Sequence, residues 1–569
     1  MKKNSHKCAK NKTMLQNAAI LFIAMGITKV VGALLKIPLG NILGGLGMSY
    51  FSSAYSVFGP IYALTVAAIP TVLTKMVAQN AAAGKFKNVR KIRKVALKAS
   101  VLLGFAGTVL ILVITVPFTR FIADAPKSIP SMLIIAPSVF FCCIAAVYRG
   151  YYEGLRDTMP TAVSQVVEAV VKALLGLALA YIVLARTGSL PYAAAAAVAG
   201  ITLSEAFGLL YLVLRGLASD GISREELDFS PPPESGAVLL KKFVSEAFPI
   251  TLGALAVNLN SLIDLITVSN SINLAVSRNT AYFRAQFIYG LQGRMELSDL
   301  GNFIYGSYTG IVMSIFSLIP AVTAMVSKSA LPAIAAAWEK GNTALITRNL
   351  KILFKGTFVL GLPLCLGMAV FSEAVLKILY SAKPAEVMVC TRPLLILSSC
   401  GMFLVLSGTL FSVFYAIGRV DLPVKLMLSG ASVKLVLNLL LLGIPELNIS
   451  GAAIASVSCY FVITILGFIC LMRELKPSGI KLGLPVFFGK ALFNSLLCAA
   501  SALGFYYLIF TDFGGILNLG FSISAGAGVY LIMTAVTDKE AVQKYIIKKL
   551  PFSPRSSAHP QYSSPKRQQ

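Results

Sequence analysis

Histidine is nearly absent from this chain, which has only His6 and His559 in 569 residues. Histidine-based catalysis and histidine metal ligation within the body of the chain are therefore excluded. No GxxxxGK[ST] motif is present, so no such nucleotide site supplies energy. The nine cysteines lack the paired spacing of an extracellular disulfide framework. We predict no catalytic residues, no metal site and no cofactor, and hence a protein that is not an enzyme.

Charged residues are also scarce, at 13% of the chain, against 57% hydrophobic residues and a mean hydropathy of +0.79. About a quarter of a typical soluble domain is charged. The apolar residues form repeated runs of roughly 20, long enough to cross a hydrocarbon core of about 30 Å. The sequence therefore predicts an all-α polytopic membrane protein with about fourteen transmembrane helices. The expected spans lie near 14–38, 49–79, 95–117, 131–150, 160–184, 192–215, 240–269, 302–330, 351–371, 391–416, 424–444, 450–472, 487–510 and 515–535.

Basic residues outnumber acidic ones by 50 to 23, and their placement predicts the orientation. With both termini cytoplasmic, the dense basic runs at 84–94 (GKFKNVRKIRK) and 476–481 (KPSGIK) fall in inner loops. That asymmetry follows the positive-inside rule. Such loops face anionic membrane lipids, so the net charge of +27 requires no nucleic acid.

The two halves of the chain resemble each other. GLRDTMPTAVSQVVEAVVKALLGLAL at 154–179 parallels GRVDLPVKLMLSGASVKLVLNLLLL at 418–442, since each leads from Gly, Arg, Asp and Pro into an apolar stretch containing Val-Lys. Two further pairs of residues, Gly84 with Gly341 and Arg215 with Arg473, are separated by nearly the same number of residues as these two stretches. An even number of spans in each copy gives both the same orientation. We therefore predict two six-helix lobes as parallel repeats with a transport cavity between them, plus two C-terminal helices.

The predicted organisation follows from this repeat and from the charged segments around it. In chain order we expect a cytoplasmic basic N-terminus (1–13), an N-lobe of spans 1 to 6 (14–216), a cytoplasmic linker (217–239), a C-lobe of spans 7 to 12 (240–475), spans 13 and 14 (476–536), and a cytoplasmic basic tail, partly disordered (537–569).

Charged side chains interrupt the expected spans, where an ionisable group usually faces a protein interior or a wet cavity. The span at 160–184 carries Glu168 and Lys172 four residues apart, on one helical face, with Gln165 a turn earlier. An ion pair within the helix and a place beside a substrate are both compatible with this spacing.

Lysines also interrupt the first two expected spans. Lys29 and Lys36 lie two turns apart on one face, and Lys75 lies near the inner end of the second span. Snorkelling to an interface would explain Lys36 and Lys75 better than the deeper Lys29 and Lys172. We expect one substrate-binding cavity to be lined by the polar residues of these three spans: Lys29, Lys36, Lys75, Gln165, Glu168 and Lys172. Because lysines outnumber carboxylates at these positions, such a cavity would attract an anion such as pyrophosphate.

The second lobe has its own charged positions within spans, Asp264 in the seventh and Lys434 in the eleventh. A pair between these helices would be a local substitute for a bound cation. The remaining charged candidates are assigned to a cytoplasmic loop motif before the fifth span: Arg149, Arg156 and Asp157.

Three stretches resemble a known family. They are RGYYEGLRDTMPTAVSQVVE at 149–168, ITKVVGALLKIPLG at 27–40 and PAVTAMVSKSALPAIAAAWEKGN at 320–342. They resemble the stage V sporulation protein B group, which belongs with the lipid II flippases in the multidrug/oligosaccharidyl-lipid/polysaccharide (MOP) exporter superfamily. The resemblance implies two lobes around a central cavity, alternating access without ATP, and a bacterial cytoplasmic (inner) membrane location.

The resemblance also implies a substrate and a set of binding positions. The substrate class is undecaprenyl-pyrophosphate-linked oligosaccharide, with envelope-synthesis enzymes as candidate partners. Where the family commonly has arginine, this chain has Lys29, Lys36 and Lys172, which keep the charge but lose the planar fork that binds phosphate. Where relatives bind sodium, this chain has Asp264 with Lys434 and Asn438 nearby. The membrane potential, worth about 2.3 kcal/mol per charge per 100 mV, is then an alternative energy source for transport, in place of a gradient of a monovalent cation.

The function expected from these observations is a flippase for lipid II or a related cell-envelope glycan precursor. A multidrug/cation antiporter of the same superfamily is the first alternative, and it would want carboxylates facing the cavity. An envelope enzyme or a non-transport assembly scaffold is the second. Roles in peptidoglycan of the growing cell wall, in sporulation and in capsule polysaccharide biosynthesis all fit the sequence.

Overall fold

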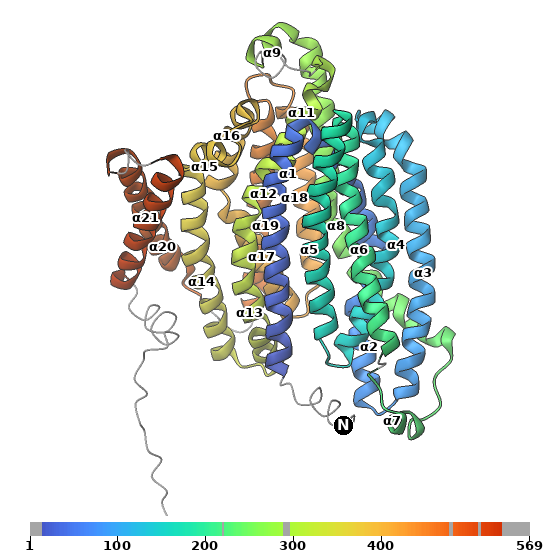
Figure 1. Ribbon diagram of the computed structural model, residues 1–569. Helices are drawn as coiled ribbons and strands as arrows, with labels where there is room; N and C mark the ends of the chain where they lie inside the picture. Colours follow the sequence, from blue (N-terminus) through green and yellow to red (C-terminus); the bar gives the residue numbers. More distant parts are fainter. Residues whose placement is uncertain are drawn as a thin grey trace, which may run out of the picture. The chain divides into compact units, whose positions relative to one another are not determined.

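The computed structural model describes residues 14–218, 221–287, 296–476, 479, 482–509 and 514–537 (Figure 1). The expected N-terminal segment 1–13 and nearly all of the tail 537–569 lie outside these ranges, as does the side chain of Lys29. The described residues form helices and turns, with no strand among them. The chain divides into two compact units, Met1–Leu482 and Gly483–Gln569, each described by itself.

The first half of the large unit consists of long helices joined by short turns. These are α1 (Met14–Thr65), α2 (Ile69–Ala82), α3 (Phe86–Pro117), α4 (Ile129–Gly154), α5 (Met159–Thr187) and α6 (Leu190–Ala218), with η2 (Phe118–Ile122) and η3 (Pro126–Ser128) between α3 and α4. The sequence marks both ends of α5. Pro160 occupies the first turn, where its missing N–H is harmless, and Gly188 ends the helix in the left-handed conformation at φ 65°.

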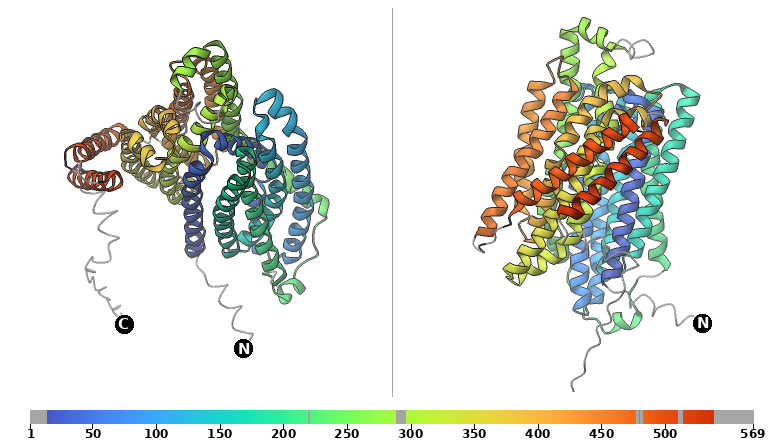
Figure 2. Two further views of the ribbon diagram at one scale, coloured as in Figure 1. Left: turned by 45° about the horizontal axis from the view of Figure 1, so that its top comes forward. Right: turned by 90° about the vertical axis from the view of Figure 1, so that its left-hand side faces the viewer.

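The second half of the large unit begins after the short linker helix α7 (Arg224–Asp228). Its helices are α8 (Gly236–Arg278), α9 (Thr280–Gln286), η4 (Leu297–Asp299), α11 (Leu300–Gly306), η5 (Ser307–Val312), α12 (Met313–Phe316), α13 (Leu318–Glu339), α14 (Thr343–Val370), α15 (Ser372–Leu379), α16 (Pro384–Ser399), α17 (Met402–Ala416), α18 (Asp421–Leu441) and α19 (Ile449–Leu475). Figure 2 shows α3–α6 gathered on one side of this unit and α13–α19 on the other. Helix α1 contacts α5 of the first half and both α8 and α11 of the second.

The small unit is a helical hairpin. It contains α20 (Leu484–Gly504), η7 (Phe505–Ile509) and α21 (Gly515–Thr537). The two long helices pack closely at Gly526, where a Cβ atom would lie 2.7 Å from the Cβ of Ala502. Asn494 in α20 donates a hydrogen bond to the Thr537 hydroxyl at 2.8 Å. These contacts make the C-terminal helices a self-contained pair.

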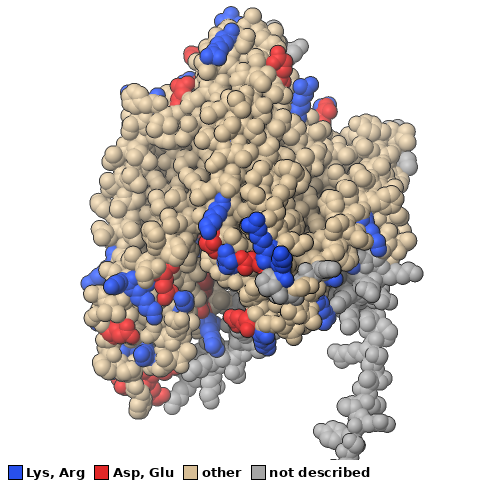
Figure 3. All heavy atoms as spheres, turned by 180° about the vertical axis from the view of Figure 1, so that it is seen from behind, with Lys and Arg blue, Asp and Glu red and all other residues tan. Residues whose placement is uncertain are grey.

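Twelve described helical segments are long and apolar enough to cross a membrane, or thirteen if the bent pair α16–α17 counts as one span. The polytopic all-α class is confirmed, while the count of about fourteen stays a prediction. The count depends on how broken helices are treated. In α1, for example, Gly44 has φ 63° and ψ −177° and divides the helix into two legs. On the face in Figure 3, charged side chains of the large unit gather mainly in its lower half, below an uncharged band.

Two pairs of turns support the internal repeat. Gly84 after α2 and Gly341 after α13 have φ angles of 72° and 61°. Arg156 after α4 and Gly418 after α17 have φ angles of 63° and 79°, and their separation equals that of Lys172 and Lys434. In all four turns the next N–H donates to the carbonyl five residues earlier, at 2.9 to 3.1 Å. This is the Schellman pattern of a helix end, repeated at corresponding places in both lobes.

Helices α5 and α6 approach each other through a pair of glycines, as is common between helices in membranes. A Cβ atom on Gly200 would lie 2.4 Å from the backbone nitrogen of Gly176. We expect Gly200→Ala to destabilise the protein by about 1–3 kcal/mol, the usual effect of overpacking, and to lower its thermal unfolding midpoint in detergent. Gly408→Ala in α17 is the control, because no atom lies within 4 Å of its added Cβ. Equal midpoints for the two variants would contradict the close approach.

Candidate functional site

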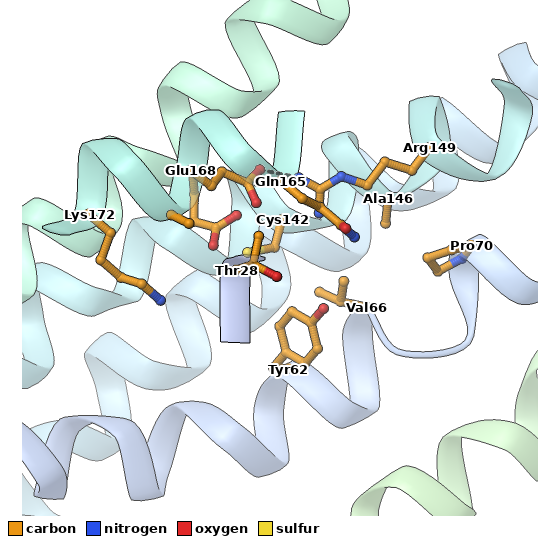
Figure 4. Close-up of a pocket in the computed structure, with 12 residues that line it drawn as sticks. Thr28, Tyr62, Val66, Pro70, Cys142, Ala146, Arg149, Gln165, Glu168 and Lys172 are labelled. Atoms are coloured by element: carbon orange, nitrogen blue, oxygen red, sulfur yellow. Dashed lines mark hydrogen bonds and ion pairs between the residues drawn. The ribbon is translucent and has the colours of Figure 1, made fainter. Parts of the chain in front are cut away.

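The main candidate site is a cavity of about 250 Å³ in the first lobe. Residues of α1, α2, α4, α5 and α6 line it (Figure 4). Its charged lining consists of Arg149, Glu168, Lys172 and Glu205. A polar space of this size can hold several waters, so charged groups here need not be fully dehydrated.

Arg149 and Glu168 form an ion pair inside this cavity. Their side chains are 15% and 12% exposed, and the Arg149 Nε also donates to the Ser164 hydroxyl at 3.1 Å. Figure 4 shows the two charged groups converging from α4 and α5. Assignment of Arg149 to a loop motif was therefore wrong. Helix α4 continues to Gly154, so Arg149 lies more than one turn before the helix ends, and its side chain lines the cavity instead of a loop.

Lys172 enters the same cavity but makes a different set of contacts. The i,i+4 ion pair with Glu168 does not form, because the guanidinium of Arg149 pairs with that carboxylate instead. Tyr55, Glu205 and Glu168 are the principal electrostatic neighbours of Lys172. Lys36 of α1 is near enough for the two ammonium groups to repel each other. Both lysines are half-buried, and no described carboxylate lies within ion-pairing distance, 4.0 Å, of either.

Glu205 is the cavity residue that the sequence analysis missed. It is the one carboxylate in the apolar helix α6, and that isolation in an apolar span was the available signal. With Glu205 included, the charged lining has two cations and two carboxylates. The expected excess of lysines over carboxylates is therefore wrong for the lining of this cavity. Lys36, a further predicted cavity residue, lies near Lys172 but is not part of the lining.

The other predicted N-lobe residues fall in several places. Gln165 lines the cavity, and its side-chain oxygen is buried without a hydrogen-bond partner among the described residues. Lys75 was expected in the cavity as one alternative, but it is 56% exposed and pairs with Glu246 of α8 at 3.1 Å. A carboxylate at the lobe boundary thus holds this lysine outside the cavity. Arg156 and Asp157 lie in the turn between α4 and α5.

The second-lobe candidates form one buried cluster. The Lys434 Nζ lies 2.7 Å from Asp264 Oδ2, and both side chains are under 10% exposed. The amide of Asn438 donates to the other Asp264 oxygen at 3.3 Å and to the Thr267 hydroxyl at 2.8 Å. A sodium ion does not fit these residues, because the ammonium already occupies the position beside the carboxylate where a cation would be held.

Comparison with known proteins decides the family. A family model described as "Polysaccharide biosynthesis protein" matches residues 14–338, more than half of the chain. The chain belongs to the polysaccharide biosynthesis protein family. A second model, described as "Lipid II flippase MurJ", matches residues 301–524. The first match contains the whole N-lobe cavity of this polysaccharide biosynthesis family member.

Two relatives match most of the family member's length. Stage V sporulation protein B of Bacillus subtilis is 24% identical over 547 residues, which cover 95% of this chain and 98% of that protein. Lipid II flippase MurJ of Bacillus subtilis is 21% identical over 476 residues, which cover 81% of this chain and 83% of that protein. The resemblance to the stage V sporulation protein B group is confirmed.

Solved structures resemble the chain in fold. One described as lipid II flippase MurJ in an inward closed conformation has a TM-score of 0.64 at 14% identity, covering 92% of this chain and 100% of that one. An inward-facing multidrug resistance MATE transporter of the MOP superfamily has a TM-score of 0.61 at 16% identity, covering 81% and 98%. The predicted MOP transporter architecture is confirmed by these likenesses.

Proposed function

We propose that this chain is a flippase for an undecaprenyl-pyrophosphate-linked oligosaccharide, lipid II or a related envelope glycan precursor, in the bacterial cytoplasmic membrane. The family, the names of two relatives and the transporter fold support this. The structural observation that carries it is the lysine pair, Lys36 and Lys172: Lys172 lines the cavity, Lys36 is near enough to repel it, and neither has a carboxylate within ion-pairing distance among the described residues.

The lysine pair favours binding of an anion. Two neighbouring ammonium groups that are partly removed from water destabilise each other. Each offers three N–H donors, and a diphosphate offers several acceptor oxygens with negative charge. A diphosphate between the two lysines would replace their repulsion by two attractions, which are strong at the low dielectric of a membrane interior.

The rest of the cavity would position this anion. The carboxylate of Glu168 pairs with Arg149, so it competes less for Lys172 than its spacing in α5 implies. The oligosaccharide is far larger than the cavity and would occupy the space between the lobes, while the polyprenyl chain stays in the bilayer. Rocking of one lobe against the other would then expose the headgroup on the opposite side. This role is transport and involves no covalent step.

The Asp264–Lys434 pair indicates which energy source drives transport. An ammonium fixed beside Asp264 supplies the charge that a coupling cation would otherwise bring. The membrane potential, about 2.3 kcal/mol per charge per 100 mV, can act on an anionic headgroup directly. We therefore propose coupling to the membrane potential, with anionic lipids at cytoplasmic basic loops and envelope-synthesis enzymes as partners.

A multidrug/cation antiporter is the second candidate, and Glu205 favours it. A carboxylate that lines the cavity without an ion pair among the described side chains is the type of residue that a cationic substrate would need. Cells that lack this protein would then become sensitive to cationic dyes while keeping normal wall synthesis.

The test of the proposed function is complementation. The native lipid II flippase of a bacterial host is depleted, this chain is expressed, and the lipid II accessible at the outer leaflet is measured. We expect accessibility to return to near the level before depletion. If the protein is present in the membrane and accessibility does not return, lipid II is not its cargo. Dye sensitivity of a deletion strain would then favour the antiporter.

A further inference from the structure

A second cleft, of about 600 Å³, opens on the C-lobe beside α15 and α16. Its lining includes Glu373, Lys377, Tyr380 and Arg392. Figure 1 shows these two helices at the end of the large unit opposite the start of α1. The distribution of basic residues in the sequence predicts that this end is the outer one. Nothing in the transport cycle proposed above uses this cleft.

Arg392 is the unusual residue of this cleft. It lies eight residues into α16 from Pro384, about 12 Å along the axis at a rise of 1.5 Å per residue. Met388 and Leu395, one turn to either side, are 50% and 46% exposed. The guanidinium is therefore attached to an exposed apolar face of a helix that forms part of a candidate span. A charge at such a position needs a partner, and no described carboxylate pairs with Arg392.

Neither carboxylate near the cleft pairs with Arg392. Glu373 pairs with Lys377 at 2.6 Å on α15. Glu386, the other carboxylate of α16, is buried and accepts the backbone N–H of Gly45 at 3.0 Å, where α1 is broken. The charged lining of the cleft is thus two cations and one carboxylate, with a net positive charge centred on Arg392.

The floor of the cleft is fixed by the N-lobe. Tyr380 is fully buried and packs so closely on α1 that a Cβ atom on Gly40 would lie 2.8 Å from its ring. Next to it, the amide of Asn41 donates to the carbonyl of Leu379 at 2.8 Å. A floor held by two lobes keeps the charged side chains of α15 and α16 facing one space, which favours binding of a ligand without rearrangement.

We propose that this cleft binds the phosphate group of an anionic lipid from the outer leaflet. The guanidinium of Arg392 matches two phosphate oxygens in its planar fork, and Lys377 is a second cation in the lining. The acyl chains lie along the exposed Met388 and Leu395. A phospholipid such as phosphatidylglycerol and a polyprenyl phosphate carrier present the same chemistry. The site stands apart from the cargo proposed above, since it uses none of the N-lobe lysines.

The test is lipid binding by the full-length protein. Purified protein is titrated with phosphatidylglycerol against a phosphatidylcholine background, and bound lipid is counted by native mass spectrometry. We expect Arg392→Gln to weaken phosphatidylglycerol binding about tenfold, as the loss of a charge-assisted bidentate contact. Glu373→Gln should tighten binding several-fold, because it removes the one negative charge in the lining. Arg186→Gln, at an exposed arginine in the last turn of α5, should leave binding unchanged.

The outcomes separate the lipid sources and the alternatives. Undecaprenyl phosphate that displaces phosphatidylglycerol from the wild type, but not from Arg392→Gln, identifies the carrier lipid. Phosphatidylglycerol binding that depends on Arg392 and resists undecaprenyl phosphate identifies a phospholipid site. Wild-type affinity of Arg392→Gln for both lipids overturns the proposal. If Arg392→Gln does not fold, Glu373→Gln decides, since its side chain is 59% exposed; unchanged binding in that variant also overturns the site.

Discussion

Lys172→Ala is expected to lower outer-leaflet exposure of lipid II about tenfold or more in the complementation assay, the size of effect that loss of one charge-assisted contact produces. The substitution removes one ammonium of the pair with Lys36, so the diphosphate loses half of its cationic partners. The Arg149–Glu168 ion pair is untouched, and the fold should survive. Lys172→Arg should retain part of the activity, because it keeps the charge while changing the geometry.

Lys75→Ala is the matched control for Lys172→Ala. Lys75 is also a lysine within a predicted span, but it is exposed and pairs with Glu246 outside the cavity. An exposed ion pair contributes about 0–1 kcal/mol, so transport should remain near the wild-type level. If both variants lose transport equally, with equal amounts of each protein in the membrane, the lysine pair has no special role in transport. Wild-type transport by Lys172→Ala would contradict the assignment of the cavity.

Most of the fold could be predicted from the sequence. Apolar runs long enough to cross a bilayer dictate helices, because backbone groups have no other partner in lipid. The repeat was visible in short motifs, and the matching turns at Gly84 and Gly341 show why those positions recur: each needs a left-handed residue. The division of α1 at Gly44 falls between the first two predicted spans, 14–38 and 49–79, but the contact that holds it could not be predicted, since a glycine in an apolar helix only permits a break. The contact from Glu386 on a distant helix stabilises it.

The candidate site was predictable to the extent that it depends on local spacing. Gln165, Glu168 and Lys172 share a face of one helix, and all three line the cavity. The partner of Glu168 was not predictable, because two cations compete for it and only the packing of α4 against α5 brings Arg149 closer. Sequence spacing determines which residues share a helical face, but it does not determine which neighbouring helix faces them.

Lys434→Met should destabilise the protein by about 3–5 kcal/mol, the usual result of removing one partner of a buried ion pair. Asp264 and Lys434 are both almost fully buried at 2.7 Å, so the substitution leaves a carboxylate without its cation. Thermal unfolding in detergent measures the loss. The double variant Asp264→Asn with Lys434→Met should recover most of it, because the uncompensated charge is then gone. A Lys434→Met variant as stable as the wild type would contradict a structural ion pair.

The same variant tests whether the ammonium takes the place of a coupling cation. Without Lys434, the Asp264 carboxylate is left unpaired beside the Asn438 side chain, which also contacts the Thr267 hydroxyl and whose oxygen has no hydrogen-bond partner among the described residues. Oxygen ligands of this kind bind hard cations, and a ligand that binds only the folded state raises its stability with concentration. Sodium should therefore raise the unfolding midpoint of Lys434→Met and leave that of the wild type unchanged. A sodium response in the wild type would instead mean that the ammonium and the ion do not compete, and it would replace the membrane potential with a sodium gradient as the proposed drive.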